Sequence, residues 1–460
     1  MQTRGAPPPL PLLLLPLLLL PAARGVHMLW QLSDVHVDGE YAATGAAAAW
    51  CRPETAGQGS EHWFGQPGCG LPWRTVQSAV DTMRANLPGA DAVLWTGDTA
   101  PHWPYPDWTH VFPKLRRLAD MLRTAFPEAQ IVPVIGNHDA YPSDQFPSDN
   151  GTFYHEYLEQ SGWSELLPES ARRTFRRGGY YAVDVGDLRV IVLNTALYYY
   201  RNRDLRHTGD DPAGQLAWLD DQLAAGRPTI VTAHISPGFH HGSVNQTSLR
   251  SPHNYQLWRR LNRAGLSTRI ANIFGHEHMD TFQNVYRRDI RLEQHTSALN
   301  TYFMGPSLYP GARSRPRNPG VRVYTVVSDR VLNDYIQYHF DLDAANRAHL
   351  RDPEVSPAKF WNITYRMRQA YGLNDLTTMS MHLLFKMMKE DDAVFKKYWR
   401  FAGGLHDQHP ACDAKCKKER LCIISTQVDA AMEECLAGVG QLLASLGLVL
   451  AAGLLARLAA

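Results

Sequence analysis

Five short apolar runs along the chain each end directly in a cluster of polar residues. Their length and continuous hydrophobicity are typical of strands that are buried on both faces of a sheet. The runs cover residues 28–33, 90–96, 130–135, 229–233 and 269–274. Helical patterns lie between the first three runs, at Trp73–Asn86 and Trp108–Phe126. This alternation of strand and helix predicts an α/β fold that is built around sheets.

Two antiparallel strand pairs are expected later in the chain. The segment 180–199 holds two runs on either side of the turn Gly186-Asp187, which predicts a hairpin. A second pair is expected at 321–327 and 331–340. The main domain is therefore expected to span residues 27–345.

The pattern becomes helical in the last quarter of the chain. The clearest helices are expected at 360–371 and 379–388. We expect these helices to belong to a small domain over 353–436.

Both ends of the chain carry targeting patterns. Residues 1–24 run from Arg4 through a Leu/Pro-rich stretch to small residues, which predicts a secretory signal peptide, with a disordered or membrane-anchoring N-terminus as the alternative. Residues 437–460 are almost entirely Leu, Ala, Gly and Val, and small residues precede the stretch. A GPI-attachment signal fits this tail best, while a retained membrane helix and a docked amphipathic helix are the alternatives. The predicted location is the extracellular face of the cell membrane or, for a released form, the extracellular space.

Six cysteines and three sequons agree with a secreted chain. An even cysteine count in an oxidising compartment predicts three disulfides, with Cys412 paired to Cys416 and Cys422 to Cys435. The remaining two cysteines are Cys51 and Cys69. A zinc knot in the last four cysteines is the alternative. Glycosylation is expected at Asn150, Asn245 and Asn362, each of which begins an Asn-X-Thr sequon.

The formal net charge of +1 gives no overall field that would attract an anionic polymer. We therefore expect no binding of nucleic-acid polymers. Any selectivity for anions must come from a local site.

The polar residues after the five apolar runs have the types that bind metals. Because ligand sites in α/β sheets lie at the carboxyl ends of strands, these segments are expected to meet. Imidazole and carboxylate ligands together suit zinc, and one bridging carboxylate can help to hold two ions about 3.5–4 Å apart. The segments are Asp34-Val-His36, Gly97-Asp98, Gly136-Asn137-His138-Asp139, His234 and Gly275-His276-Glu277-His278.

This ordered set closely resembles the calcineurin-like metallophosphoesterases. The resemblance implies a sandwich of two mixed β-sheets flanked by helices, with two metal ions, which we expect to be Zn²⁺. It places Asp34, His36, Asp98 and His278 on one ion. The second ion would be bound by Asp98, Asn137, His234 and His276, so that Asp98 bridges.

The resemblance also suggests catalytic residues beside the metals. His138 would face the leaving group as an acid or charge stabiliser, oriented by Asp139, with support of the metal ligands as its alternative role. Pro101 stands where purple acid phosphatases carry a tyrosine ligand to ferric iron, so an iron centre of that kind is not expected. His102 matches a histidine that the acid sphingomyelinase group keeps beside the phosphate.

Longer segments are similar to acid-sphingomyelinase-like phosphodiesterases. They are 94–98, 136–147, 193–199 and 275–282. No saposin-like domain precedes Asp34, and the apolar tail favours the membrane-anchored type 3B branch over the secreted type 3A branch. Glu277 departs from these relatives, which often have Thr or His between the two histidines. For Trp103, Tyr198, Tyr199 and the His240-His241 pair, lining of the substrate cleft and simple packing both remain open.

The expected function is hydrolysis of phosphodiester bonds outside the cell by a dinuclear zinc centre. The substrate class is a nucleotide or a sphingomyelin-type phospholipid headgroup, with a role in lipid metabolism at the cell surface. A surface-anchored lipid-binding or regulatory protein with a structural metal site is the alternative.

Overall fold

The computed structural model describes residues 25–148, 150–204, 211–263, 269–287, 294–327 and 331–437. The expected signal peptide at 1–24, and the apolar tail from residue 438 onward, lie outside these residues. Within the described ranges, no helix is both long enough and apolar enough to cross a membrane.

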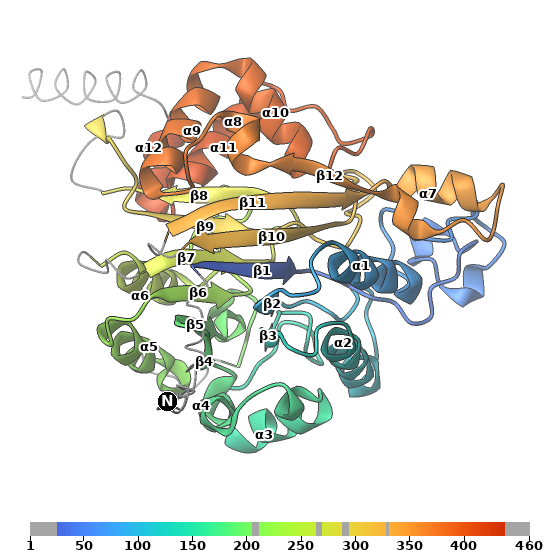
Figure 1. Ribbon diagram of the computed structural model, residues 1–460, viewed down its shortest axis with the longest axis horizontal. Helices are drawn as coiled ribbons and strands as arrows, with labels where there is room; N and C mark the ends of the chain where they lie inside the picture. Colours follow the sequence, from blue (N-terminus) through green and yellow to red (C-terminus); the bar gives the residue numbers. More distant parts are fainter. Residues whose placement is uncertain are drawn as a thin grey trace, which may run out of the picture.

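Two mixed six-stranded sheets form the centre of the molecule (Figure 1). The first has the order β12-β11-β10-β1-β2-β3, and the second has the order β4-β5-β6-β7-β9-β8. The strands of the first sheet are β1 (Val26–Leu32), β2 (Ala92–Trp95), β3 (Gln130–Pro133), β10 (Gly320–Val327), β11 (Val331–Phe340) and β12 (Trp361–Arg366). Those of the second are β4 (Tyr181–Val185), β5 (Leu188–Leu193), β6 (Thr229–Ala233), β7 (Arg269–Phe274), β8 (Thr281–Val285) and β9 (Asn300–Met304).

The parallel strands explain why the five apolar runs lack alternation. β1, β2 and β3 pair in parallel, as do β5, β6 and β7, with β9 following β7. Side chains of parallel strands in such sheets are covered on both faces. The two sheets are also bonded to each other, because Gln31 Nε2 of β1 donates to the Phe274 carbonyl of β7 at 2.9 Å.

Helices surround the two sheets. In Figure 1, α1 and α2 lie near β2 and β3, α4 lies near β4, and α8 to α12 gather beyond β12 and β8. The helices are α1 (Trp73–Asn86), α2 (Phe112–Ala125), α3 (Gly151–Gln160), α4 (Glu169–Gly178), α5 (Gln215–Ala224), α6 (Ser251–Leu261), α7 (Leu342–His349), α8 (Met367–Tyr371), α9 (Thr378–Glu390), α10 (Asp392–Ala402), α11 (Ala414–Ser425) and α12 (Asp429–Ala437).

The fold class is confirmed, and one expected helix is wrong. Residues 360–371 form strand β12 followed by the short helix α8. Strand β11 offers a free edge, and β12 pairs with it in antiparallel register from Phe340↔Trp361 to Ile336↔Arg366. Trp361 and Tyr365 are both buried, and their spacing of four residues fits one face of a helix as well as one face of a strand. The other C-terminal helices do form, but this segment extends the first sheet.

Three disulfides are present with the expected local pairing. They join Cys51 to Cys69, Cys412 to Cys416, and Cys422 to Cys435. The last two lie in and beside α11 and α12, which confirms a disulfide-stapled helical end. The sequon residues Asn150, Asn245 and Asn362 are all exposed, so their glycosylation stays a prediction that the surface allows.

Candidate metal centre

The five polar segments meet at one end of the two sheets. Each follows the carboxyl end of its strand, namely β1, β2, β3, β6 and β7. Main-chain bonds hold the first two segments side by side: Asp34 N–H donates to Gly97 O at 3.0 Å, and His36 N–H donates to Asp98 O at 3.0 Å. The sheet thus places side chains 244 residues apart in the sequence in one site, from Asp34 to His278.

The backbone is strained where five of the expected metal ligands stand. Asp34, His36, Asp98, His276 and His278 have positive φ angles of 49°, 42°, 55°, 68° and 51°. Non-glycine residues adopt this region rarely and at a cost of about 1–3 kcal/mol each. Such strain persists only where the surrounding structure enforces it, and it concentrates at functional sites.

The first group of ligand atoms comes from Asp34, His36, Asp98 and His278. These four residues each offer one ligand atom, and the atoms lie within 4.8 Å of one another. His36 Nε2 lies 3.1 Å from His278 Nε2 and 3.5 Å from Asp98 Oδ2, and His278 Nε2 lies 3.3 Å from Asp34 Oδ1. This is the set expected for one ion.

The second group shares Asp98. Asp98, His234 and His276 again place their ligand atoms within 4.8 Å of one another. His234 Nε2 lies 3.1 Å from Asp98 Oδ2 and 3.1 Å from Asn137 Oδ1. The sequence therefore predicted which side chains would meet, and the structure brings all seven together.

Asp98 Oδ2 supplies the observation that tests the fit of a metal. This atom is buried and has no hydrogen-bond partner of acceptable geometry among the described residues, although nitrogens of His36 and His234 lie close to it. A buried carboxylate oxygen without a partner is costly, and a cation on either side of it would remove that cost. The donor set, imidazole with carboxylate and amide oxygen, fits divalent metals such as zinc.

Bonds to the far side of the ligands fix their orientation. His36 Nδ1 lies 2.9 Å from Ala100 O, and His234 Nδ1 lies 2.7 Å from Thr96 O. Both rings therefore carry a proton on Nδ1 and direct Nε2 toward the site, where an Nε2 without a proton is the form that binds a metal. Asn137 Nδ2 donates to Asp144 Oδ1 at 2.8 Å, so the amide oxygen faces the site.

Burial and charge set the protonation of the group. Burial lowers the pKa of His36 and of His276 well below the ordinary value, although Asp98 opposes this shift. For Asp98, burial would raise the pKa, but the neighbouring His234 and His138 lower it well below its usual range. Burial also lowers the pKa of His234, yet Asp98 outweighs burial and raises it to about 9. Asp98 is thus ionised and held by positive charge.

Asp139 does not orient His138, contrary to the sequence-based expectation. Its carboxylate accepts main-chain N–H bonds from Asp98, Thr99, Ala100 and Gly136 at 2.7–3.1 Å. The turn that holds both residues directs the Asp139 carboxylate to the main chain of residues 98–100 instead of to the His138 ring. Asp139 is therefore a positioning residue for the Asp98 segment.

His138 and His102 stand beside the ligands as expected. The His138 ring lies 5.2 Å from the His36 ring, and the His102 ring stacks on His36 at 3.6 Å. The Nδ1 atoms of His138 and His102 are buried without a partner among the described residues. Burial, with the nearby His36 and His138, lowers the pKa of His102 well below the ordinary value.

The site is also lined by side chains that the sequence motifs did not identify. The Tyr309 ring lies 4.5 Å from His102 and 5.4 Å from His278. The loop that carries Tyr309 has no metal-ligand motif, so the sequence alone could not identify this residue as part of the site. Tyr199 and His240 lie 5.4 and 5.3 Å from the His276 ring, whereas Tyr198 is buried and receives a bond from Gln215 Nε2.

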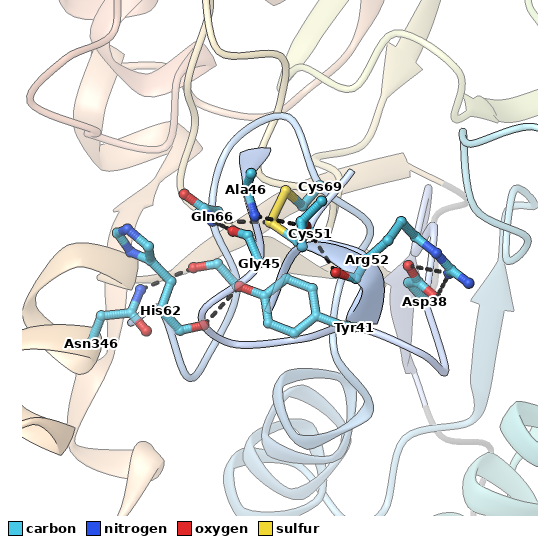
Figure 2. Close-up of a disulfide and its surroundings, with 12 residues drawn as sticks. Asp38, Tyr41, Gly45, Ala46, Cys51, Arg52, His62, Gln66, Cys69 and Asn346 are labelled. Carbon is cyan, nitrogen blue, oxygen red and sulfur yellow. Dashed lines mark hydrogen bonds and ion pairs between the residues drawn. A yellow bond between two sulfur atoms is a disulfide. The ribbon is translucent and has the colours of Figure 1, made fainter. Parts of the chain in front are cut away.

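Figure 2 shows a loop that is closed by a disulfide, with Arg52 of this loop beside Asp38. The Cys51–Cys69 bridge closes the segment after β1, and within it Arg52 donates to both carboxylate oxygens of the buried Asp38 at 3.0 and 3.1 Å. The Arg52 guanidinium lies over the Trp103 ring at 4.0 Å. Since Trp103 follows His102 directly, this stacking fixes the backbone beside His102.

Glu277 points away from the metal ligands into a polar chain of its own. Its Oε2 accepts bonds from His241 N–H at 2.7 Å and His241 Nδ1 at 2.8 Å, and His241 Nε2 faces Arg317 Nη2 at 3.3 Å. Burial raises the pKa of Glu277 to about 7. The acid thus ties the loop after β6 to the loop after β7.

Comparison with known families covers most of the chain. Residues 27–280 match the calcineurin-like phosphoesterase family, and residues 297–440 match the acid sphingomyelin phosphodiesterase C-terminal region. The chain belongs to the calcineurin-like phosphoesterase family. The expected metal ligands thus lie in the part that matches this family. Strand β12 and the C-terminal helices lie in the part that matches the acid sphingomyelin phosphodiesterase C-terminal region.

Three relatives are similar over long stretches. The rat "Cyclic GMP-AMP phosphodiesterase SMPDL3A" is 29% identical over 430 residues, covering 90% of this chain and 92% of that protein. The mouse "Acid sphingomyelinase-like phosphodiesterase 3b" is 28% identical over 433 residues, covering 89% and 90%. The bovine "Sphingomyelin phosphodiesterase" is 28% identical over 390 residues, covering 80% of this calcineurin-like chain but 58% of the relative.

Two solved structures are also similar. The structure of PhoD has a TM-score of 0.44 at 12% identity and covers 69% of this chain and 67% of that one. The purple acid phosphatase PPD1 of yellow lupin has a TM-score of 0.39 at 15% identity and covers 70% and 52%.

Proposed function

We propose that this protein is a zinc-dependent phosphodiesterase whose two ions share Asp98. The observation that carries the proposal is the buried carboxylate of Asp98, which belongs to both groups of ligand atoms. When bound, two such ions would lower the pKa of a coordinated water and offset charge on the phosphoryl oxygens. Asp34, His36 and His278 would hold one ion, and Asn137, His234 and His276 the other.

The remaining side chains would handle substrate. His138 and His102 lie on the His36 side of the site, each with a buried Nδ1 that has no partner in the described part of the chain. His138 would donate a proton or hydrogen bond to the leaving oxygen, and His102 would contact the phosphate. Tyr309 would pack against the group attached to the phosphate, because its ring lies beside those of His102 and His278.

The substrate class follows from the relatives and remains part of the proposal. Their names include a cyclic GMP-AMP phosphodiesterase and a sphingomyelin phosphodiesterase. A nucleotide diester and a phosphocholine headgroup present the same ester to the site. We further propose that the chain acts at the extracellular face of the cell membrane through a GPI anchor, which the apolar sequence after Ala437 supports.

A substrate panel with metal analysis tests the proposal. The purified protein should contain two zinc ions per chain and hydrolyse bis-p-nitrophenyl phosphate together with either cyclic GMP-AMP or sphingomyelin. A chelator should abolish turnover, and added zinc should restore it. Stoichiometric metal with no chelator-sensitive turnover on any diester would instead support a surface protein with a structural metal site. Release from cells by a phosphatidylinositol-specific phospholipase tests the anchor.

A further inference from the structure

A groove in the C-terminal region lies apart from the metal centre. Its volume is about 630 Å³, which is in the range of pockets that take ligands of nucleotide or headgroup size. Its lining residues belong to β12, α8, α10 and the turn after α10, and these elements lie in the upper part of Figure 1. Its lining residues are Tyr365, Arg366, Gln369, Ala370, Ala393, Lys396, Lys397, Arg400, Phe401 and Leu405.

Four of these lining residues are cationic, and no described lining residue is acidic. Arg366, Lys396, Lys397 and Arg400 are exposed, and none of them forms an ion pair within the described ranges, although Lys397 Nζ donates to Ala370 O at 3.0 Å. The acidic residues at the start of α10 are engaged elsewhere: Asp391 caps the helix, and Asp392 binds Lys417 at 2.6 Å. A chain with a net charge of only +1 therefore concentrates positive charge here.

This concentration has a structural cost. Lys396 and Arg400 are four residues apart on α10, and like charges at that spacing destabilise a helix by a few tenths of a kcal/mol. The helix dipole accounts for Arg400 in the last turn, and Asp392 one turn earlier attracts Lys396, but neither accounts for Arg366 on the neighbouring strand. An anion in the groove would remove the repulsion.

The floor of the groove is apolar and aromatic. Tyr365 and Phe401 stack with ring centroids 4.2 Å apart and planes within 5°. Ala370 and Leu405 complete an apolar surface beside the cations. A rigid aromatic pair next to several guanidinium and ammonium groups suits a ligand with one charged end and one apolar or planar end.

We propose that this groove binds a phosphate-bearing ligand. Its phosphate contacts Arg366, Lys396 and Arg400, and its apolar or planar body lies against Phe401. Two sources present this chemistry, an anionic phospholipid headgroup in a membrane and a free nucleotide. The site is independent of the metal centre.

Binding measurements on the full-length protein distinguish the two sources. One arm measures co-sedimentation with phosphatidylcholine vesicles, with and without phosphatidylserine. The other arm uses calorimetric titration with adenosine monophosphate and with inorganic phosphate. We expect saturable binding in one arm that weakens as salt rises. In the double variant K396Q/R400Q, and in R366Q, that binding should weaken about tenfold or more.

A matched control separates the groove from general charge. The double variant R173Q/R177Q removes two exposed cations at the same spacing from helix α4, and it should bind as the wild type does. Melting temperature and metal content should be unchanged in all three variants, because none of the residues touches the metal ligands. The proposal is overturned if no ligand binds in a salt-dependent way, or if the control loses as much binding as the groove variants.

Discussion

At the scale of single residues, charge and burial decide the roles in this site. Asp98 belongs to both groups of ligand atoms, and its Oδ2 has no hydrogen bond of acceptable geometry within the described residues. His138 stands next to a ligand in the sequence but outside both groups. The two residues should therefore fail in different ways when they are replaced.

Replacing Asp98 by Asn should empty the metal centre. The amide oxygen can still accept the bond from His138 N–H, now 2.8 Å from Oδ1, but the bridging charge is lost. We expect metal content to fall below one ion per chain and kcat/KM to fall by at least about a hundredfold. Atomic absorption and diester turnover check this, and full metal occupancy in D98N would contradict a bridging role.

Replacing His138 by Gln should leave the metals in place. Gln keeps a polar group but cannot transfer a proton, so kcat should fall about a hundredfold or more while two ions remain bound. The same assays, with a pH profile, check this. Loss of metal in H138Q would show that the residue supports the ligands rather than the leaving group.

A residue away from the site should set part of the acid sensitivity. Burial lowers the pKa of His409 to about 4, although its bond to Pro316 O at 3.0 Å opposes the shift. As the pH falls, His409 of the unfolded chain is protonated near pH 6.5, whereas His409 of the folded chain is protonated only near pH 4. The unfolded state therefore gains a proton first, and stability falls between about pH 6.5 and 4.

The variant H409N should lose this pH dependence. Denaturant titration at pH 7 and at pH 4.5 gives the loss of unfolding free energy on acidification for each protein. This loss should be about 2 kcal/mol smaller in the variant than in the wild type. Parallel profiles for the two proteins would show that His409 is not the group responsible.

At the scale of elements, the site depends on how closely the strand-end loops approach. A Cβ on Gly136 would lie 2.1 Å from Asp98 N and 2.2 Å from Asp98 Oδ1. Asp139 reinforces the same contact by bonding the main chain on both sides. The loop after β3 can therefore carry only glycine at this position.

Replacing Gly136 by Ala should displace the Asp98 segment. We expect the free energy of unfolding to fall by about 2–4 kcal/mol and metal affinity to fall with it. A methyl group on Gly89, in the turn before β2, would meet no atom within 4 Å. G89A is therefore the matched control and should change stability by about 0.5 kcal/mol or less. Thermal melts and metal titration check the pair.

At the scale of the whole molecule, one buried carboxylate joins the C-terminal region to both sheets. Asp280, two residues after His278, accepts hydrogen bonds from Arg322 of β10 and from Tyr365 of β12. Arg322 is fully buried, and the charge of Asp280 outweighs burial in raising its pKa well above the ordinary value. Asp280 thus holds together the second sheet, the first sheet and the added strand.

Replacing Asp280 by Asn should be strongly destabilising. It leaves the Arg322 charge buried without a counter-charge, so the free energy of unfolding should fall by about 3–5 kcal/mol. Asp120, which pairs with Arg123 on the surface, is the control, and D120N should cost about 1 kcal/mol or less. Equal losses in the two variants, measured by urea titration, would contradict this role of Asp280.

The residues of the metal centre could be predicted because each sits where a buried strand must end. Continuous apolar runs mark β1, β2, β3, β6 and β7, and the residue types after them allow little chemistry besides metal binding. Strand β12 could not be predicted, because its formation depends on the free edge of β11.

The sequence by itself determined the five buried strands that end in the site, the ligand types and the cysteine pairing, since these depend on local hydrophobicity, donor chemistry and short spacing. The tertiary structure decided the direction of Asp139, the place of Tyr309 beside His102, the Glu277–His241 pair and the cationic groove. These depend on loops that meet only after the two sheets have packed. No periodicity along the chain encodes such distances.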